Sequence, residues 1–194
     1  MNAAEETAVS QYLRPIVLVG LMGAGKTTVG RSLAARLRLP FVDSDHEIER
    51  AANVSIPDLF ERYGEQHFRD GERRVIARLL DGKPKVIATG GGAFMNECTR
   101  TLILERGYAV WLDADIDILA GRVLRRPGQR PLLQDRDPRI ALAELAAVRN
   151  PIYALARICV RNQSKRHAAA VEEIIKGIEA VATPSPACPK TSIT

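Results

Sequence analysis

Short apolar runs alternate along the chain with longer segments in which apolar residues recur every three or four positions. The runs are rich in Val, Ile and Leu, as expected for strands that are buried on both faces of a parallel sheet. The intervening segments are typical of amphipathic helices, whose apolar stripe follows a period near 3.6. This alternation predicts an α/β fold, a five-stranded parallel sheet flanked by helices. The strands are expected over residues 16–19, 39–42, 85–89, 108–112 and 157–160.

Capping residues, prolines and glycines mark the expected ends of the helices. Asp137 followed by Pro138 combines a capping residue with proline at the first helical position, and Gly64 and Gly107 are expected to end the helices before them. In the helix that starts at Pro138, the spacing predicts that Leu142, Leu145 and Val148 point inward. Helices are expected to end near residues 38, 52, 64, 80, 106, 124, 151 and 181.

The length of 194 residues fits one domain with a full hydrophobic core. Residues 1–13 are polar without a sustained period, which predicts a flexible lead-in. Residues 183–194 contain three prolines and no core-forming pattern, and we expect a disordered tail. Residues 14–182 remain as the folded domain. Within it, residues 125–136 contain four arginines, Pro and Gly without a period; this favours a short mobile lid, with a solvated connector as the alternative.

The composition is that of an ordinary globular protein, with 46% hydrophobic and 26% charged residues. The formal net charge is +5, but the arginines are scattered among acidic residues, so small anionic substrates explain the charge as well as nucleic acid does. No segment interleaves aromatic and basic residues as a single-strand-binding surface would. We therefore expect no nucleic-acid partner.

Cysteine usage and hydropathy indicate the compartment. Cys98, Cys159 and Cys188 are odd in number and widely spaced, which is typical of reduced thiols in a cytoplasm and of neither a disulfide framework nor a zinc site. The N-terminal residues lack an apolar signal region, and no later run has the length of a membrane span. We expect a cytoplasmic protein that does not associate with membranes.

The most informative motif is Gly20-Leu21-Met22-Gly23-Ala24-Gly25-Lys26-Thr27, which fits the phosphate-loop pattern. It lies between an apolar strand and a helical pattern, the context that this motif requires, and a chance Gly-rich turn is therefore disfavoured. In such a loop, glycines let backbone amides approach an anion, Lys26 reaches the β- and γ-phosphates, and Thr27 ligates Mg²⁺. The residues expected to bind the nucleotide phosphates are Gly23, Ala24, Gly25, Lys26, Thr27 and Thr28.

Three further motifs follow. Asp43-Ser44-Asp45 comes directly after the second strand, at the edge where open α/β sheets bind ligands. The alternative is that either Asp only caps the next helix; we expect this cap at Asp45, where it is compatible with a role in binding. Arg69 and Glu72 are three residues apart on a helix and can pair, so that Glu72 orients the guanidinium. Gly90-Gly91-Gly92 follows the third strand; because glycines cost backbone entropy, close approach by a ligand or another backbone is favoured over a merely flexible loop.

Together these motifs resemble those of the shikimate kinase family, which is similar in fold to the phosphate-loop nucleoside monophosphate kinases. The matching segments, in the family's order, are 20–28, 43–45, 68–72, 90–92, 130–133 and 149–153. Many kinases share the phosphate loop, whereas the combination of the other motifs is specific. The resemblance implies ATP-dependent, Mg²⁺-assisted phosphorylation of the shikimate 3-hydroxyl, on the pathway to chorismate and the aromatic amino acids.

The resemblance also implies roles for single residues. Lys26, Asp45 and Arg130 would be catalytic, with Arg130 reaching the transferring phosphoryl group from the lid. The residues that would bind shikimate are Asp45, Arg69, Gly90, Gly91, Gly92 and Arg149. The arginines suit its carboxylate, because a guanidinium binds a carboxylate through two parallel hydrogen bonds, and an Asp can orient a hydroxyl and accept its proton. Thr27 and, through water, Asp43 would hold Mg²⁺. The arginine that stacks on adenine is left open between Arg125 and Arg126.

Two other functions stay open. A related kinase of another small metabolite, such as gluconate, would share the loop and lid but need not carry Arg69 and Arg149 together. A non-catalytic, nucleotide-gated binding protein would be expected to have lost Lys26 or Asp45, and both are present. We expect a monomeric kinase whose partners are ATP and shikimate.

Overall fold

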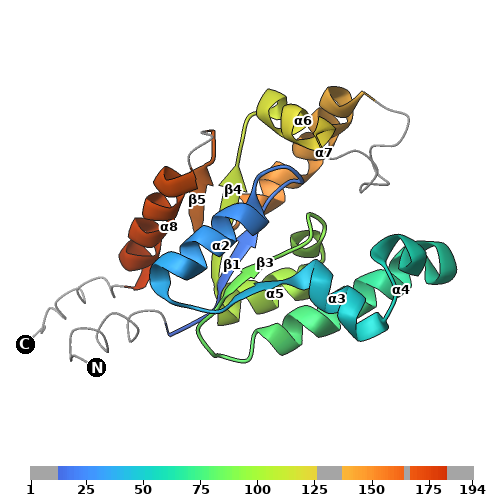
Figure 1. Cartoon of the computed structure of the whole chain (residues 1–194), viewed down its shortest axis with the longest axis horizontal. Coiled ribbons are helices and arrows are strands. Elements are labelled where there is room, and N and C mark those ends of the chain that lie inside the picture. Colours follow the sequence, from blue (N-terminus) through green and yellow to red (C-terminus); the bar gives the residue numbers. More distant parts are fainter. Residues whose placement is uncertain (1–12, 126–136, 164–166, 183–194) are drawn as a thin grey trace, which may run out of the picture.

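The computed structural model describes residues 13–125, 137–163 and 167–182. Its sheet has five parallel strands in the order β2-β3-β1-β4-β5 (Figure 1). The strands are β1 (Ile16–Val19), β2 (Phe41–Asp43), β3 (Val86–Ala88), β4 (Tyr108–Asp113) and β5 (Ile158–Arg161). The predicted α/β fold is confirmed. The residues predicted to form the lead-in and tail, apart from Leu13, and those of the lid beyond Arg125 lie outside the described part of the chain.

The burial of each strand follows from its place in the sheet. All four residues of β1 are fully buried, because β1 is central and pairs with both β3 and β4. Strand β5 lies at an edge, and there buried and exposed residues alternate, with Cys159 and Arg161 exposed. A continuous apolar run therefore marks the centre of the sheet, and alternation marks this edge.

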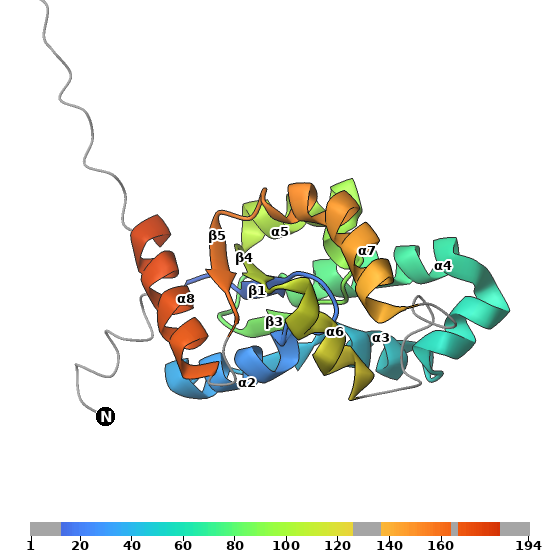
Figure 2. The same cartoon turned by 90° about the horizontal axis from the view of Figure 1, so that it is seen from above.

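Helices cover both faces of the sheet. The helices are α2 (Lys26–Leu37), α3 (Ser44–Ala52), α4 (Ile56–Leu79), the 3₁₀ helix η1 (Ala93–Met95), α5 (Glu97–Arg106), α6 (Ile116–Leu124), α7 (Pro138–Tyr153) and α8 (His167–Ala182). Helices α2 and α8 pack together on one face, and α5 lies on the other against β4 and α4 (Figure 2). None of the described helices is long and apolar enough to span a membrane.

Strand pairing moves two of the predicted boundaries. The second strand is shifted toward Asp43, because Phe41 and Asp43 are in register with Val86 and Ala88 of β3. As a result Asp43 is the N-cap of α3, and its side chain accepts a hydrogen bond from the backbone N–H of Asp45. The predicted cap at Asp45 is therefore wrong. In the same way β4 extends to Asp113, which pairs with Arg161, and α6 starts later than expected.

Packing also corrects helix α7. The helix continues through Pro151 to Tyr153, and its buried residues Leu142, Ala146 and Tyr153 are four and seven positions apart, the spacing of one helix face. Val148 is 70% exposed, and its predicted inward position is wrong. Gly64 behaves nearly as predicted: it has non-helical dihedrals (φ 78°, ψ 171°) and kinks α4 into two helical parts.

Candidate active site

The predicted site residues meet at the carboxyl edge of the sheet. The phosphate loop follows β1, Asp43 ends β2, and the three glycines follow β3. Since these strands are parallel and adjacent, their carboxyl ends lie side by side. Helices α4 and α7 bring Arg69 and Arg149 to the same edge, where both contact the glycine loop.

The phosphate loop has the backbone that its glycines allow. Gly20 has φ 136°, and a Cβ there would lie 2.5 Å from the carbonyl oxygen of Leu112, so no other residue fits. Gly25 has φ 93° and is the N-cap of α2. The loop therefore leads directly into a helix N-terminus, whose amides and dipole favour an anion.

Lys26 is held across this loop. The residue is 9% exposed, and its ammonium group donates hydrogen bonds to the carbonyl oxygens of Gly20 at 2.7 Å and Leu21 at 2.9 Å. These bonds fix the buried cation against the backbone of the loop. The charge is thus placed where a polyphosphate would meet the converging loop amides.

Thr27 and Asp43 offer a pair of oxygen ligands. The Thr27 hydroxyl donates to Asp43 Oδ2 at 2.9 Å, and Asp43 Oδ1 accepts the Asp45 N–H at 3.1 Å. A hydroxyl and one carboxylate suit Mg²⁺, which proteins usually bind through one or two such groups together with substrate phosphates. Within the described residues, no group of three or more Asp, Glu, His or Cys able to hold a metal occurs.

Asp45 lies beside Gly90 in a partly buried, acidic environment. Burial raises the pKa of Asp45 to about 6, and the nearby Asp43 and Glu72 add to this, while Lys26 opposes it. A Cβ on Gly90 would lie 2.7 Å from Asp45 Oδ1, so the missing side chain makes room for the carboxylate. The carboxylate is ionised at neutral pH but has a raised proton affinity, as suits a group that accepts a proton.

Arg69 is immobilised by two carboxylates. Its guanidinium donates to Glu72 Oε2 at 2.8 Å and to Glu65 Oε1 at 3.1 Å, which confirms the predicted Arg69–Glu72 pair. Glu72 is 2% exposed, and burial raises its pKa while Arg69 and Arg149 counteract this. A Cβ on Gly92 would lie 2.5 Å from Arg69 Nη1, so this glycine accommodates the guanidinium.

Arg149 and Tyr153 both donate to the carbonyl oxygen of Gly91, Arg149 at 3.2 Å. The Tyr153 ring is fully buried and stacks on Trp111 and Phe94, and burial raises the pKa of its hydroxyl to about 12. Tyr153 therefore stays a neutral donor and holds the glycine loop in place. The sequence motif contained Tyr153, but nothing in it assigned this role.

The described structure thus brings together every predicted site residue except Arg130, which lies outside the described residues. Thr28 is in the first turn of α2 at an exposed position. Arg122 and Asn162, which the sequence did not single out, contact the phosphate loop from α6 and from the end of β5.

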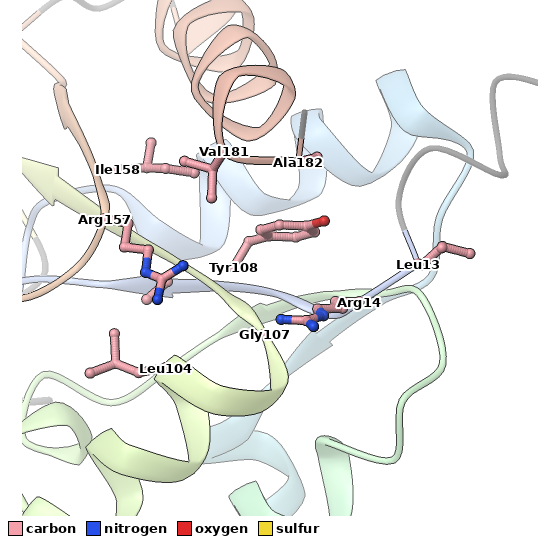
Figure 3. A pocket seen from close by; sticks show the side chains of 10 residues that line it. Leu13, Arg14, Leu104, Gly107, Tyr108, Arg157, Ile158, Val181 and Ala182 are labelled. Atoms are coloured by element: carbon pink, nitrogen blue, oxygen red, sulfur yellow. The ribbon is translucent and has the colours of Figure 1, made fainter. Parts of the chain in front are cut away.

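A separate cavity of about 390 Å³ lies at the opposite, amino edge of the sheet. Arg14, Tyr108 and Arg157 contribute its polar side chains, and Leu104, Ile158 and Val181 its apolar ones (Figure 3). None of the predicted site residues that the structure describes lines it.

Comparison with known proteins identifies relatives of this chain. The family model for shikimate kinase matches residues 22–179. The shikimate kinase of Bradyrhizobium diazoefficiens is 54% identical over 167 residues, which cover 86% of this chain and 80% of the relative. That of Caulobacter vibrioides is 54% identical over 165 residues, which cover 85% of this chain and 82% of the relative.

Solved structures agree with these sequence matches. Shikimate kinase from Acinetobacter baumannii in complex with shikimate has a TM-score of 0.84 and 38% identity, covering 91% of this chain and 98% of that one. Shikimate kinase from Aquifex aeolicus has a TM-score of 0.72 and 34% identity, covering 87% and 98%. A gluconokinase from Sinorhizobium meliloti, at 20% identity and a TM-score of 0.59 over 88% and 94%, shares the fold alone.

Proposed function

The chain belongs to the shikimate kinase family, and we propose that the carboxyl edge of its sheet carries out the family's reaction with the residues described above. The protein transfers the γ-phosphoryl group of ATP to the 3-hydroxyl of shikimate, giving shikimate 3-phosphate and ADP. One observation carries the assignment of the site: Asp45, Arg69 and Arg149 converge on a single glycine loop next to the phosphate loop. A phosphoryl donor and a hydroxylated carboxylate can therefore be held side by side.

The nucleotide half of the site acts by charge and position. Loop amides and Lys26 bind the polyphosphate, and the ammonium neutralises charge that grows on the β–γ bridging oxygen as its bond to the γ-phosphorus breaks. Mg²⁺, when bound with the nucleotide, supplies further charge neutralisation, and Thr27 and Asp43 are the residues that would hold it. Most of the rate enhancement in such transfers comes from this positioning and charge stabilisation.

The acceptor half orients shikimate. Arg69 and Arg149 bind the carboxylate, and Asp45 binds the hydroxyls and accepts the proton of the attacking one. The hydroxyl oxygen forms its bond to the γ-phosphorus while ADP leaves, and the proton moves to the Asp45 carboxylate. A pKa of about 6 supports this role, because the group is ionised at neutral pH yet takes up a proton more readily than an exposed Asp does.

ADP release over a panel of acceptors tests the function. Shikimate should support turnover at least about 100-fold above gluconate and nucleoside monophosphates, because only shikimate offers both the carboxylate and the ring hydroxyls that these residues match. Equal turnover with gluconate would favour the related metabolite kinase. Nucleotide binding without turnover on any acceptor would favour the non-catalytic binding protein.

Several further features belong to the same proposal. We assign Arg130 to the transferring phosphoryl group and residues 125–136 to a lid from the sequence motif, and residues 14–182 to the kinase domain. We also propose a monomer that works in the cytoplasm without a nucleic-acid or membrane partner. The free thiols of Cys98 and Cys159 support a reducing compartment.

A further inference from the structure

We propose that Asn162 is a positioning residue of the nucleotide site, which fixes the orientation of the peptide group between Ala24 and Gly25 in the phosphate loop. The inference rests on the proposed function, because it deepens the role of that loop. Asn162 is 1% exposed and lies directly after β5, on the side of the loop away from the shikimate residues. Its Nδ2 donates to the carbonyl oxygen of Ala24 at 2.7 Å.

The geometry of the peptide group links this contact to phosphate binding. In a trans peptide the carbonyl and the N–H of the next residue point in opposite directions. Holding the Ala24 oxygen toward Asn162 therefore directs the Gly25 N–H away from Asn162, to the concave side of the loop where a phosphate binds. Without this donor, the peptide group could rotate and its amide would no longer be preorganised for an anion.

Asn162 is itself held rigidly. Its backbone N–H donates to the Asp113 carbonyl at 2.7 Å, which continues the pairing of β4 with β5. Its side chain is in contact with the loop, since a Cβ on Gly25 would lie only 2.8 Å from Asn162 Nδ2. The sheet thus supplies a fixed reference from which the amide acts on the loop.

Arg122 of α6 completes the support. Its guanidinium donates to the Gly23 carbonyl at 3.1 Å, to the Ala24 carbonyl at the longer distance of 3.5 Å and to the Asn162 carbonyl at 3.3 Å. Helix α6 lies beside the start of α2 (Figure 2). The N–H of the same Gly23–Ala24 peptide group donates to the Leu21 carbonyl at 3.2 Å. Two successive peptide groups of the loop are therefore anchored: that of Gly23 by α6, and that of Ala24 by the short hydrogen bond from Asn162 with a longer one from Arg122.

The role is specific to the nucleotide. Arg69, Arg149 and Asp45 contact the glycine loop after β3, whereas the Asn162 side chain contacts the phosphate loop after β1. Loss of the Asn162 donor should therefore weaken binding of polyphosphate and leave shikimate binding unchanged. A residue that merely stabilised the fold would affect both ligands alike.

Two substitutions test this. Asn162→Asp has nearly the same shape but places an acceptor against the Ala24 oxygen, and Asn162→Leu removes the donor without burying a charge. In each, we expect the Kd for Mg·ADP from calorimetry to rise about 10-fold or more, because the Ala24 carbonyl loses its short hydrogen bond and keeps only the longer one from Arg122. The Kd for shikimate, measured on the same samples, should stay within about twofold, since its binding residues keep their contacts.

Gln163→Glu is the matched control. It makes the same amide-to-carboxylate change one residue later, at an exposed side chain that bonds Asp115 on the surface, and should leave both dissociation constants unchanged. An unchanged Kd for ADP in either folded Asn162 variant would overturn the inference, as would an equal loss of shikimate affinity. If instead the wild-type protein bound ADP but phosphorylated no acceptor, the proposed function would fail while this role in the loop stood.

Discussion

At the scale of single residues, the ionisation of Asp45 links the chemistry of the site to the stability of the fold. The pKa of Asp45 is about 6 in the folded protein and 3.8 as an ordinary Asp. Between these values the folded state holds a proton that the unfolded state has lost, so stability decreases as the pH rises through this window. At pH 7 the ionised group costs the fold up to about 3 kcal/mol, because it is buried near other acids.

Asp45→Asn should therefore separate activity from stability. We expect kcat to fall by about 10² or more, because the amide cannot accept the hydroxyl proton. The same change should stabilise the fold at pH 7 by about 1 to 3 kcal/mol, since a neutral side chain replaces a buried charge. Steady-state kinetics and urea unfolding measure the two effects.

The pH dependence provides the control for this prediction. Near pH 4 the Asp45 side chain of the wild-type protein is neutral in the folded state, as Asn is at every pH. The difference in unfolding free energy between the two proteins should therefore largely disappear, because an acid with a raised pKa destabilises the fold only where it is ionised. The wild-type kcat/KM for shikimate should fall as the pH drops through about 6, because this parameter follows the pKa of Asp45 in the free protein. If the substitution changed only the Michaelis constant for shikimate, Asp45 would bind the substrate without accepting its proton.

Arg149→Lys tests carboxylate recognition at a single residue. Lysine keeps the positive charge but loses the planar fork that binds a carboxylate through two hydrogen bonds. The Michaelis constant for shikimate should rise about tenfold or more, while that for ATP changes less than about threefold. Equal changes in both constants would remove Arg149 from the carboxylate site.

At the scale of elements, the glycine loop between β3 and η1 leaves room for charged side chains that a loop with Cβ atoms would exclude. A Cβ on Gly90 would lie 2.7 Å from Asp45 Oδ1 and 3.0 Å from Glu72 Oε1, and a Cβ on Gly92 would lie 2.5 Å from Arg69 Nη1. The loop carbonyl of Gly91 is held by Arg149 and Tyr153. The loop is therefore held between α3, α4 and α7, which carry these side chains. A merely flexible connection would not account for these contacts.

Gly92→Ala should displace the Arg69 guanidinium, because the new methyl group would lie 2.5 Å from its Nη1. We expect the Kd for shikimate to rise about tenfold or more, with the Kd for ADP unchanged, when both are measured by calorimetry. Gly121→Ala is the control: among the described residues, no atom outside the backbone of α6 itself lies within 4 Å of the Cβ position. It should leave both ligands unaffected and stabilise the helix by about 0.5 to 1 kcal/mol. A normal shikimate Kd in Gly92→Ala would show that Arg69 need not occupy its observed position.

At the scale of the whole molecule, the residues proposed to bind the two substrates lie on different sets of elements at one edge of the sheet. The proposed nucleotide residues are on α2 and its preceding loop, and the proposed shikimate residues are on α3, α4, α7 and the loop after β3. Each ligand should therefore stabilise the whole fold through its own residues. Because both sets rest on the same sheet, unfolding releases both ligands.

Thermal unfolding with each ligand tests this division. At a ligand concentration of about 100 Kd, linkage gives about 2.7 kcal/mol and so a rise in Tm of roughly 5 to 10 °C for a chain of this size. Lys26→Ala should lose most of the Tm shift produced by ADP and keep the shift produced by shikimate. The ammonium group is held within the phosphate loop, where we propose that it binds the polyphosphate, and it is not among the residues proposed to bind shikimate. Loss of both shifts would mean that Lys26 supports the fold rather than the nucleotide.

The sequence alone determined the fold class and the succession of strands and helices along the chain, and it supplied nearly all of the residues in the proposed site. Strand and helix periods, capping residues and turn glycines act over a few positions, so they can be recognised without knowing what packs against them. The phosphate loop is readable for the same reason, because its eight residues and both flanks are contiguous.

Only the tertiary structure decided which atoms meet across long separations. Pairing of β2 with β3 made Asp43 the helix cap in place of Asp45, and the course of α7 exposed Val148. Tyr153 reaches Gly91 across 62 positions and Asn162 reaches Ala24 across 138. Neither contact leaves a local pattern, because a buried carbonyl can be satisfied by any donor that the packing of the sheet and helices brings within hydrogen-bond distance.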